Sequence, residues 1–252
     1  MATRFDAAFD FTSRVTLITG GAAGIGLAIA EAFQERGATL ALVDRNPTVV
    51  EVAKQFGSQH LGYTADVSDE VSCDRIVTDV VEKLGRIDHL INNAGIGILA
   101  PAEDTRTEDW DKTLAINLNG PFFYSRRVGR EMLRQQYGRI ITIASQAAVI
   151  GLEDHLAYCT SKAALLGMTR VLALEWGPRG VTANTISPTV VETELALVGW
   201  AGEKGEVMKK KIPSRRFVRP DEVAMAALYL ASEAAGMING DNLLVDGGYS
   251  NQ

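Results

Sequence analysis

Cysteine and histidine are scarce in this sequence of 252 residues, with two of the first and three of the second. Cys73 and Cys159 stand far apart, and no Cys or His residues show the spacing of a metal site, so no metal is expected. Two isolated cysteines indicate reduced thiols rather than a disulfide framework, which favours a cytoplasmic protein.

Positive charge is not in excess, because 31 acidic residues outnumber 25 Lys and Arg and leave a net charge of −6. An extended nucleic-acid footprint is therefore not expected.

Long apolar runs are also missing. The uncharged stretch 15–30 is too short to span a bilayer, and residues 1–11 lack the apolar core of a secretion signal, so neither a membrane partner nor export is expected.

Arginine is the one charged residue type that gathers locally. The cluster comprises Arg126, Arg127, Arg130, Arg134 and Arg139. Such a run is typical of a solvated helix face. A docking patch for an acidic carrier protein is the alternative.

Short apolar runs rich in β-branched residues alternate with helical patterns along the chain, without repeats or low-complexity linkers. This alternation predicts an α/β fold in one domain, 1–252, with a Rossmann-like doubly wound parallel sheet flanked by helices. Residues 1–13 form an N-terminal extension in this interpretation, and 189–213, with loop and short helical pieces, form a substrate lid. In such a sheet, ligands bind where the strands end. The predicted strand ends hold Gly20, Asp44, Asp66, Asn93, Ser145 and Pro188.

A glycine-rich turn joins the first predicted strand to a helix, with Gly20, Gly24 and Gly26 in the pattern Gly-x-x-x-Gly-x-Gly. Glycines let the backbone approach a pyrophosphate, and the helix N-terminus offers free N–H groups and the positive end of its dipole. The strand–turn–helix context favours phosphate binding over a tight turn without ligand.

Two acids follow the next predicted strands. Asp44 lies at about the offset at which a carboxylate accepts the ribose hydroxyls of NAD and repels the 2′-phosphate of NADP. Arg45 follows and tempers this preference, but the glycine turn holds no Lys or Arg, so NAD is favoured. Asp66, followed by Val67, is either a contact for the adenine edge or a loop acid. Ser68 is the expected N-cap of the next helix.

Small residues and amides follow the strand predicted at 87–91. Asn93, Ala94 and Gly95 suit a backbone lying against a cofactor, although an Asx-type turn would have the same composition. Asn117 stands among apolar neighbours in a segment predicted to be helical, 107–119. A buried asparagine must be paired, and a structural hydrogen bond is its default interpretation.

Ser145 closes the apolar run 140–144, and Tyr158 and Lys162 follow in a helical pattern that puts them on one face, one turn apart. A nearby ammonium favours the phenolate and lowers the pKa of a tyrosine, which suits proton transfer. A serine hydroxyl at the strand end can hold the oxygen that exchanges this proton. Taken alone, a Tyr-x-x-x-Lys pair is more often an ordinary feature of an amphipathic helix.

These motifs together resemble the short-chain dehydrogenase/reductase family over nearly the full chain. The resemblance rests on Thr-Gly-x-x-x-Gly-x-Gly at 19–26, Asn-Asn-Ala-Gly at 92–95, Asn117, Ser145, Tyr-x-x-x-Lys at 158–162 and Pro188. Pro188-Thr189 departs from the proline-glycine that is usual in the family, in the loop next to the nicotinamide.

The resemblance implies a role for each matching residue. Tyr158 is the general acid/base, Lys162 tunes its pKa and binds the nicotinamide ribose, Ser145 polarises the substrate, and Asn117 holds a water that relays protons. The implied cofactor contacts are Gly20, Gly24, Ile25, Gly26, Asp44, Asp66, Val67, Asn93, Ala94, Gly95, Tyr158, Lys162, Pro188, Val191 and Thr193. The implied substrate contacts are Ser145, Gln146, His155, Tyr158 and Trp200.

Within the family, Ser145-Gln146, His155, Tyr158-Cys159, 188–193 and the region of Trp200 resemble enzymes of small polyols, diols and ketoses, such as D-threitol and propane-1,2-diol dehydrogenases and L-xylulose reductases. The expected reaction interconverts a secondary alcohol and a ketone with NAD. A 3-oxoacyl-carrier-protein reductase using NADPH is the first alternative, and a catalytically silent dinucleotide sensor is the second. The resemblance also implies a homotetramer.

Overall fold

A seven-stranded parallel sheet lies at the centre of the protein, in the order β3-β2-β1-β4-β5-β6-β7. The computed structural model describes residues 7–251. The strands are β1 (Val15–Thr19), β2 (Thr39–Asp44), β3 (Leu61–Thr64), β4 (His89–Asn92), β5 (Gly138–Ile143), β6 (Val181–Pro188) and β7 (Asn242–Val245). The predicted doubly wound parallel sheet is confirmed.

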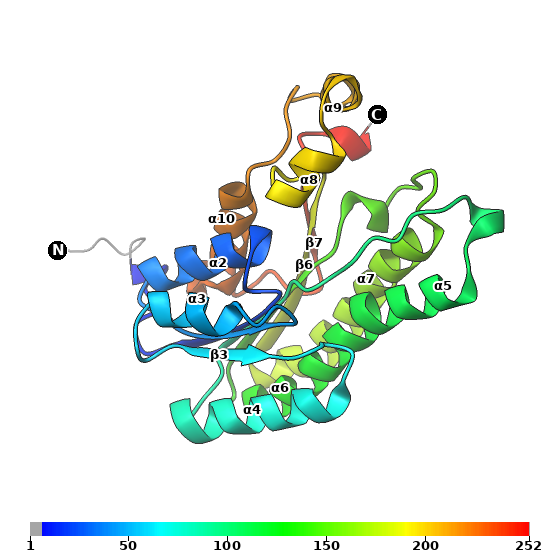
Figure 1. Ribbon diagram of the computed structural model, residues 1–252. Helices are drawn as coiled ribbons and strands as arrows, with labels where there is room; N and C mark the ends of the chain where they lie inside the picture. Colours follow the sequence, from blue (N-terminus) through cyan, green and yellow to red (C-terminus); the bar gives the residue numbers. More distant parts are fainter. Residues whose placement is uncertain (1–6, 252) are drawn as a thin grey trace.

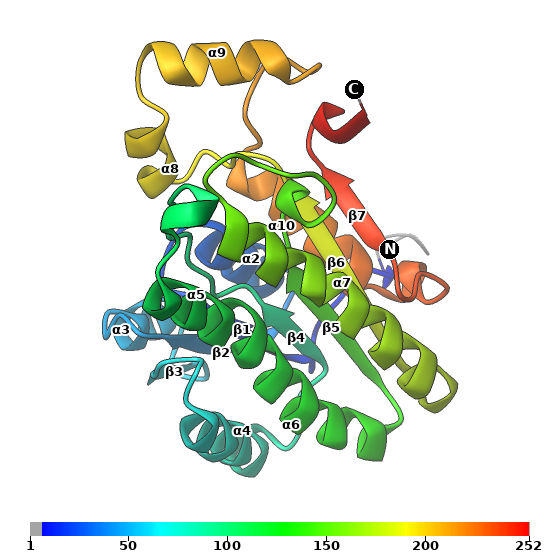
Figure 2. The ribbon, with the colours of Figure 1, turned by 90° about the vertical axis from the view of Figure 1, so that its right-hand side faces the viewer.

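Helices cover both faces of this sheet (Figures 1 and 2). The α-helices are α2 (Gly24–Glu35), α3 (Val49–Gln55), α4 (Glu70–Leu84), α5 (Thr107–Leu114), α6 (Gly120–Gln135), α7 (Leu156–Trp176), α8 (Glu194–Gly199), α9 (Glu203–Lys211) and α10 (Pro220–Ala231). Single turns lie at η1 (Ala102–Asp104), η2 (Ala115–Asn119), η3 (Gln146–Ala148), η4 (Gly177–Arg179), η5 (Glu233–Ala235) and η6 (Tyr249–Asn251).

Two apolar layers hold the helices on the sheet. On one face, Ile29 and Phe33 of α2 and Val223 of α10 pack with Ile18 of β1. On the other face, α4 and α6 pack on the strand side chains that point to the opposite side of the sheet. Met132 of α6 is fully buried there. Every residue of β1 is buried, as expected for a central strand of a parallel sheet covered on both sides.

Local chemistry sets several helix ends. Gly37, with φ of 89°, turns the chain from α2 into β2, and Gly85, with φ of 79°, is the left-handed C-cap of α4. The N-cap of α4 is Asp69, whose carboxylate accepts from the N–H of Val71. The prediction of Ser68 as this N-cap is therefore wrong by one residue, because the hydroxyl of Ser68 donates instead to Asp66.

Part of the expected N-terminal extension, 1–13, belongs to the core. Residues 1–6 lie outside the described residues, but Phe11 is buried, stacks on Phe33 with ring centroids 5.1 Å apart, and donates its N–H to the carbonyl of Arg36. Phe11 also packs against His89 in β4. The sequence shows three phenylalanines in this segment and gives no sign of the distant partners of Phe11.

The helix predicted over 107–119 continues into α6 through a turn of π-helix, η2. A π-turn widens the helix by one residue and is common at functional sites. Asn117 lies in this turn and is fully buried.

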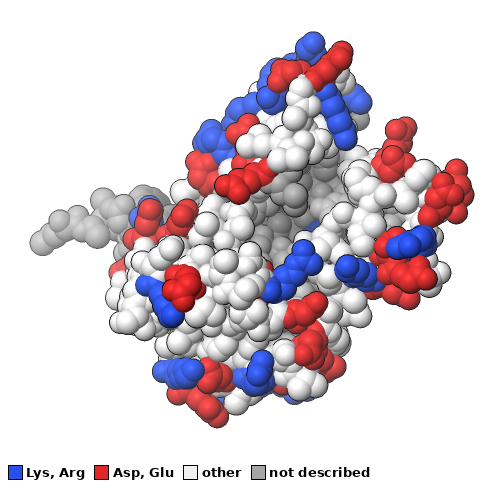
Figure 3. Space-filling model, viewed as in Figure 1, with Lys and Arg blue, Asp and Glu red and all other residues white. Residues whose placement is uncertain are grey.

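The segment predicted as a lid, 189–213, forms α8 and α9, which project beyond the carboxyl ends of β6 and β7 (Figures 1 and 2). Figure 3 shows the molecule hollowed between this segment and the body of the fold. Across residues 7–251, no helix has both the length and the apolar character needed to cross a membrane.

Candidate functional site

The loops after β1 and β4 meet where the strand order reverses, because β1 lies between β2 and β4. The side chain of Asn93 donates to the carbonyls of Thr19 and Gly20 at 3.0 and 3.1 Å, and the N–H of Asn93 donates to the hydroxyl of Thr19 at 3.0 Å. These bonds fasten the glycine loop to the adjacent strand end. Ligands of doubly wound sheets bind at this switch point.

The glycines of the loop are required by its geometry. Gly20 has φ of 68°, and a Cβ there would lie 2.7 Å from the side-chain nitrogen Nδ2 of Asn93. A Cβ on Gly26 would lie 2.0 Å from the carbonyl oxygen of Gly20, so this glycine lets α2 pack directly on the loop. Ala23, the N-cap of α2, has no side-chain cap, which leaves the N–H groups of the first turn for an anion.

An open groove with a volume of about 750 Å³ runs along this loop. Its lining includes Gly20, Gly24, Ile25, Asp44, Asp66, Val67, Asn93, Ala94, Gly95 and Thr193, ten of the residues implied as cofactor contacts. The glycine turn, the free helix N-terminus and the groove together fit a dinucleotide. Gly26 is not part of the lining, because it is covered by the loop that it supports.

Acidic side chains dominate the charge of the groove. Its lining includes the carboxylates of Asp44, Asp66, Glu192 and Glu194, against one basic side chain among the described lining residues, Arg45. Asp44 accepts from the N–H groups of Ala22 and Asn46 at 3.1 and 2.9 Å, which fixes the carboxylate beside the glycine loop. The carboxylate of Asp66 accepts from both the N–H and the hydroxyl of Ser68.

Asn117 is held by three hydrogen bonds. Its Oδ1 accepts from the N–H of Ile96 at 2.8 Å, and its Nδ2 donates to the carbonyl of Ile96 and to the hydroxyl of Ser161 at 2.8 and 3.1 Å. Ser161 precedes Lys162 in α7, so these bonds tie η2 to the helix of the Tyr-x-x-x-Lys motif. A Cβ on Gly95 would lie within 3.4 Å of both Asn117 Oδ1 and Lys162 Nζ, which brings the three positions together.

Lys162 is buried in α7, and its Nζ donates to the carbonyl of Ile143 at the end of β5, at 2.8 Å. Burial lowers the pKa of this ammonium to about 8. The Nζ also lies 5.8 Å from the centre of the Tyr158 ring.

The expectation that Lys162 lowers the pKa of Tyr158 is wrong for this structure. Burial raises the pKa of the Tyr158 hydroxyl, a hydrogen bond with Ser145 opposes that rise, and Cys159 adds to it. Removing a phenolate from water costs more than the single serine bond returns. The protein alone therefore keeps Tyr158 as a neutral phenol, ready to donate a proton.

Ser145 and Gln146 follow β5 directly. The hydroxyl of Ser145 accepts from the N–H of Ala147 at 3.1 Å, which makes Ser145 the N-cap of η3. Both residues are more than nine-tenths buried. The Oε1 of Gln146 has no hydrogen-bond partner among the described residues.

His155 is the N-cap residue of α7, and its ring lies edge-on to that of Tyr158, with centroids 6.0 Å apart. Its Nδ1 bonds the carbonyl of Glu153. Because a carbonyl oxygen only accepts, Nδ1 carries the proton, and Nε2 of the neutral ring remains an acceptor. A short bridge between His155 and Ala100 joins this loop to the one after β4.

Trp200 lies at the C-terminal end of α8 and packs on Phe217, with ring centroids 6.1 Å apart. Met208 and Ile212 complete the same apolar cluster. The Trp200 indole is therefore part of the apolar interior of the predicted lid. Its role as a wall over the substrate stays a prediction.

Comparisons with known proteins agree with this geometry. A family profile described as enoyl-(acyl carrier protein) reductase matches residues 20–250. D-threitol dehydrogenase of Mycolicibacterium smegmatis is 50% identical over 96% of this chain and 95% of its own length. An NAD-dependent glycerol dehydrogenase of Listeria innocua is 47% identical over 98% of this chain and 97% of its own.

Among solved structures, one from Beutenbergia cavernae, described as an NAD(P)-dependent gluconate 5-dehydrogenase with NADP at low occupancy, superposes with a TM-score of 0.92. It is 35% identical and covers 97% of this chain and all of that one. This chain belongs to the short-chain dehydrogenase/reductase family. It is an oxidoreductase that acts on CH–OH groups with a nicotinamide dinucleotide.

In this short-chain dehydrogenase/reductase, the structure brings Asn117, Ser145, Tyr158 and Lys162 together at the carboxyl ends of β4 and β5, as the sequence predicted. Pro188 ends β6. Val191 is buried and pairs with Val218, so its side chain supports the loop from the core. Thr193 caps α8 through its hydroxyl and lies against Gly24.

Sequence reasoning missed two residues near the site, Glu192 and Glu194, and singled out Thr189 only as a departure from the family pattern. Glu192 and Glu194 flank Thr193 and line the groove opposite the glycine loop. Thr189 is buried, and its hydroxyl has no partner among residues 7–251. For the two glutamates the only available signal was position, because both lie in the segment that follows a strand ending in the crevice.

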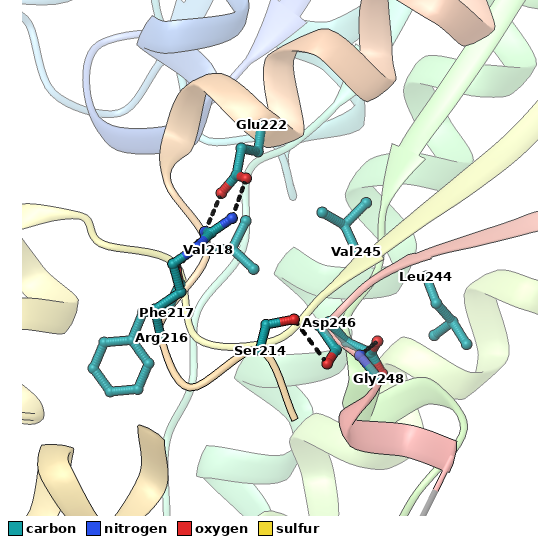
Figure 4. Close-up of a pocket in the computed structure, with 10 residues that line it drawn as sticks. Ser214, Arg216, Phe217, Val218, Glu222, Leu244, Val245, Asp246 and Gly248 are labelled. Carbon is teal, nitrogen blue, oxygen red and sulfur yellow. Dashed lines mark hydrogen bonds and ion pairs between the residues drawn. The ribbon is translucent and has the colours of Figure 1, made fainter. Parts of the chain in front are cut away.

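A second hollow, of about 260 Å³, lies between the loop after α9 and the end of β7. Figure 4 shows Arg216 and Glu222 joined across it by two short bonds, both 2.6 Å. Ser214 bonds the carbonyl of Gly247 on the other side. Arg216 and Glu222 neutralise each other there, and the carboxylate of Asp246 accepts from the N–H groups of Gly248 and Ser250.

The arginine cluster is mostly paired within the chain. Arg126 bonds Glu70, and Arg127 bonds Glu131 at 2.9 Å. Arg139 lies in β5, is buried, and pairs with Glu233, so the interpretation of all five as one solvated helix face is wrong for that residue.

Proposed function

We propose that this oxidoreductase interconverts a secondary alcohol of a small polyol or diol and the corresponding ketone or ketose, with NAD(H). The observation that carries the proposal is the convergence of Ser145, Tyr158, Lys162 and Asn117 beside a groove suited to a dinucleotide. The relatives named for threitol and glycerol support the substrate class.

The charge of the groove supports NAD over NADP. Four carboxylates line it, and a 2′-phosphate would bring further negative charge among them. In this proposal Asp44, whose carboxylate is held by two N–H groups, accepts the ribose hydroxyls. The relative from Listeria is named as NAD-dependent, whereas the structure from Beutenbergia holds NADP, and this difference makes the cofactor a point for direct measurement.

The residues of this chain supply proton transfer and positioning. When bound, the nicotinamide accepts or returns the hydride of the carbinol carbon. Tyr158 exchanges the hydroxyl proton, and Ser145 holds the same oxygen while its charge changes. Lys162, anchored on Ile143, keeps a positive charge behind the phenol below about pH 8. Asn117 holds the turn that positions α7 and, in this proposal, the water that passes the proton to solvent.

Polar groups near Tyr158 suit a substrate with several hydroxyls. Gln146 Oε1 and His155 Nε2 of a neutral ring are both acceptors, and neither has a hydrogen-bond partner among the described residues, so each can accept an O–H. Trp200 is proposed to close the far side from the lid, 189–213. In this proposal the chain forms one domain, 1–252, and the segment 189–213 is its lid.

A 3-oxoacyl-carrier-protein reductase is the second candidate, favoured only by the description of the matching profile. It would need a basic docking face. Arg126 is engaged with Glu70, and Arg127 and Arg134 with Glu131, so three of the four arginines of α6 are already paired.

We also propose a cytoplasmic homotetramer. Leu174 and Val171 on α7 and Phe122 on α6 are large apolar side chains that stay 78%, 52% and 43% exposed, and burial against further copies would remove them from water. Cys73 and Cys159 are unpaired, in keeping with a reducing compartment. Light scattering of the purified protein gives the mass that tests the assembly.

One assay tests the function. The protein is mixed with NAD and, in turn, glycerol, threitol, xylitol, butane-2,3-diol and butan-2-ol, and the absorbance of NADH is followed. We expect turnover of at least one polyol or diol, loss of turnover in Tyr158→Phe, and weaker activity with NADP. Turnover of a 3-oxoacyl thioester with NADPH, and of no polyol with either cofactor, would overturn the proposal.

A further inference from the structure

The stem of the lid, residues 190–194, carries two carboxylates that line the same groove as the glycine loop. Glu192 and Glu194 flank Thr193, and Glu194 is the first residue of α8. Thr193 touches the glycine loop itself, because a Cβ on Gly24 would lie 3.2 Å from Thr193 Cγ2. The two acids are therefore held on either side of the point where the stem meets the beginning of α2.

This point of the groove is suited to the pyrophosphate of a dinucleotide. Gly24 begins α2, the N-cap Ala23 provides no side-chain cap, and the first turn of α2 contains no acidic residue. Free N–H groups and the positive end of the helix dipole are therefore left for an anion. The loop 20–26 holds no Lys or Arg. The negative phosphates are thus met by backbone N–H groups on one side and by the stem carboxylates on the other.

The charges of the stem carboxylates are not compensated. Neither Glu192 nor Glu194 has an ion-pair partner in the part of the chain that the structure describes. Hydrogen bonds to Glu222 and, more weakly, the charge of Glu192 raise the pKa of Arg216, but two bonds of 2.6 Å already hold this guanidinium on Glu222. The N–H of Glu192 donates to the carbonyl of Val218 at 2.8 Å, which fixes the backbone of the stem beside the phosphate position.

We propose that Glu192 and Glu194 repel the pyrophosphate and so shorten the time for which the dinucleotide stays bound. The inference rests on the proposed function, because it takes NAD(H) as the occupant of the groove. Like charges repel more strongly in a partly enclosed groove than in bulk water, since less water screens them. NAD and NADH share the pyrophosphate, so the affinity for both is lowered. Faster release favours repeated turnover, because release of product often limits the rate of an enzyme.

The first test measures binding without turnover. Glu192→Gln, Glu194→Gln and the double variant remove charge at nearly constant size. We expect NADH, followed by its fluorescence, to bind about threefold to tenfold more tightly in each single variant and more tightly again in the double variant. Most of this gain should be a slower dissociation in stopped-flow measurements. Weaker binding in the variants would show that the carboxylates accept hydroxyls of the cofactor, and it would overturn the inference.

Two variants and the salt concentration serve as controls. Glu203→Gln removes the same charge from α9 of the same lid, outside the groove lining, and should leave the Kd of NADH unchanged. Glu194→Asp keeps the charge and should keep the wild-type dissociation rate. Because salt screens exposed charges, the difference between the wild type and the double variant should shrink between about 0.02 M and about 0.5 M salt. An equal gain in Glu203→Gln, or a difference that salt leaves unchanged, would overturn the inference.

A comparison of two ligands locates the repulsion. ADP-ribose contains the pyrophosphate, whereas adenosine has the same base and sugar without it. In displacement of NADH, the double variant should bind ADP-ribose more tightly by about the factor seen for NADH and should bind adenosine as the wild type does. Equal gains for both ligands, or no gain for ADP-ribose, overturn the inference and leave the proposed function standing. A folded wild-type protein that binds neither NADH nor NADPH overturns the proposed function instead.

Discussion

Lys162 Nζ donates to the carbonyl of Ile143 at 2.8 Å and stands 5.8 Å from the centre of the Tyr158 ring, so the ammonium is anchored to the sheet. Each group is shifted chiefly by its own burial, which raises the pKa of Tyr158 and lowers that of Lys162 to about 8.

The ionisation of Tyr158 in the cofactor-free protein tests this arrangement. We expect its phenolate to form above the ordinary range of a tyrosine, because burial disfavours the charged form. The measurement is an ultraviolet titration of the wild type minus that of Tyr158→Phe. A difference step at neutral pH would mean that Lys162 controls the phenol without cofactor, as the sequence alone suggested.

Tyr158→Phe should retain dinucleotide binding and lose turnover by about 10²- to 10⁴-fold, since the ring remains and only the transferable proton is removed. Quenching of tryptophan fluorescence by NAD reports binding, and NADH formation reports turnover. Near-normal turnover in a folded variant would remove Tyr158 from the catalytic assignment.

Lys162→Met should be more stable than the wild type at neutral pH and inactive. The folded protein binds the Lys162 proton less tightly than the unfolded chain does, with a pKa of about 8 against 10.5. Stability of the wild type therefore rises with pH between those values, by on the order of 3 kcal/mol, and below pH 8 the buried charge costs its full amount. Urea unfolding at pH 7 and pH 10 should show the advantage of Lys162→Met shrinking as the pH rises. A constant advantage would contradict the buried-charge account.

Asp44→Asn should raise the ratio of kcat/KM for NADP over NAD by roughly tenfold, because it removes a negative charge beside the expected 2′-phosphate and leaves Arg45 in place. The amide oxygen of Asn can still accept from the N–H of Ala22, so the loop keeps its support. Asp66→Asn is the matched control within the same groove. If both variants shift the ratio equally, general charge rather than the position of Asp44 sets the cofactor preference.

Asp88→Asn should lower the free energy of unfolding by about 3–5 kcal/mol at neutral pH, since it breaks a buried ion pair. The side chain of Asp88 is fully buried, and Arg86, Arg14 and the N–H of Val15 bond to it at 2.6–2.9 Å. Burial alone would raise its pKa, but these bonds hold the pKa below its ordinary value.

The sign of the pH effect follows from that direction. A carboxyl with a lowered folded pKa stabilises the protein above its unfolded pKa and loses this contribution as the pH falls through the folded one. Chemical unfolding of wild type and Asp88→Asn should therefore converge in acid. Asp221→Asn, which breaks an exposed pair with Arg219, is the control and should change stability little. Equal losses in both variants would contradict the argument.

The sequence by itself determined the order of elements and the places where chemistry gathers. Apolar runs such as 15–19 must be buried, glycines such as Gly20 allow a backbone that other residues resist, and residues at parallel strand ends necessarily share one edge. These are local or periodic properties, so Asp44, Ser145, Tyr158 and Lys162 could be placed at one crevice without coordinates.

Only the tertiary structure decided the rest, because burial and pairing depend on residues distant in the chain. It packed Phe11 against Phe33 and His89, seated Lys162 on Ile143, and reversed the expected pKa shift of Tyr158. It also left the side-chain oxygens of Gln146 and Thr189 buried without hydrogen-bond partners among the described residues. No pattern in the sequence records such an unpaired group, since the free energy of a polar atom is set by what the whole fold brings next to it.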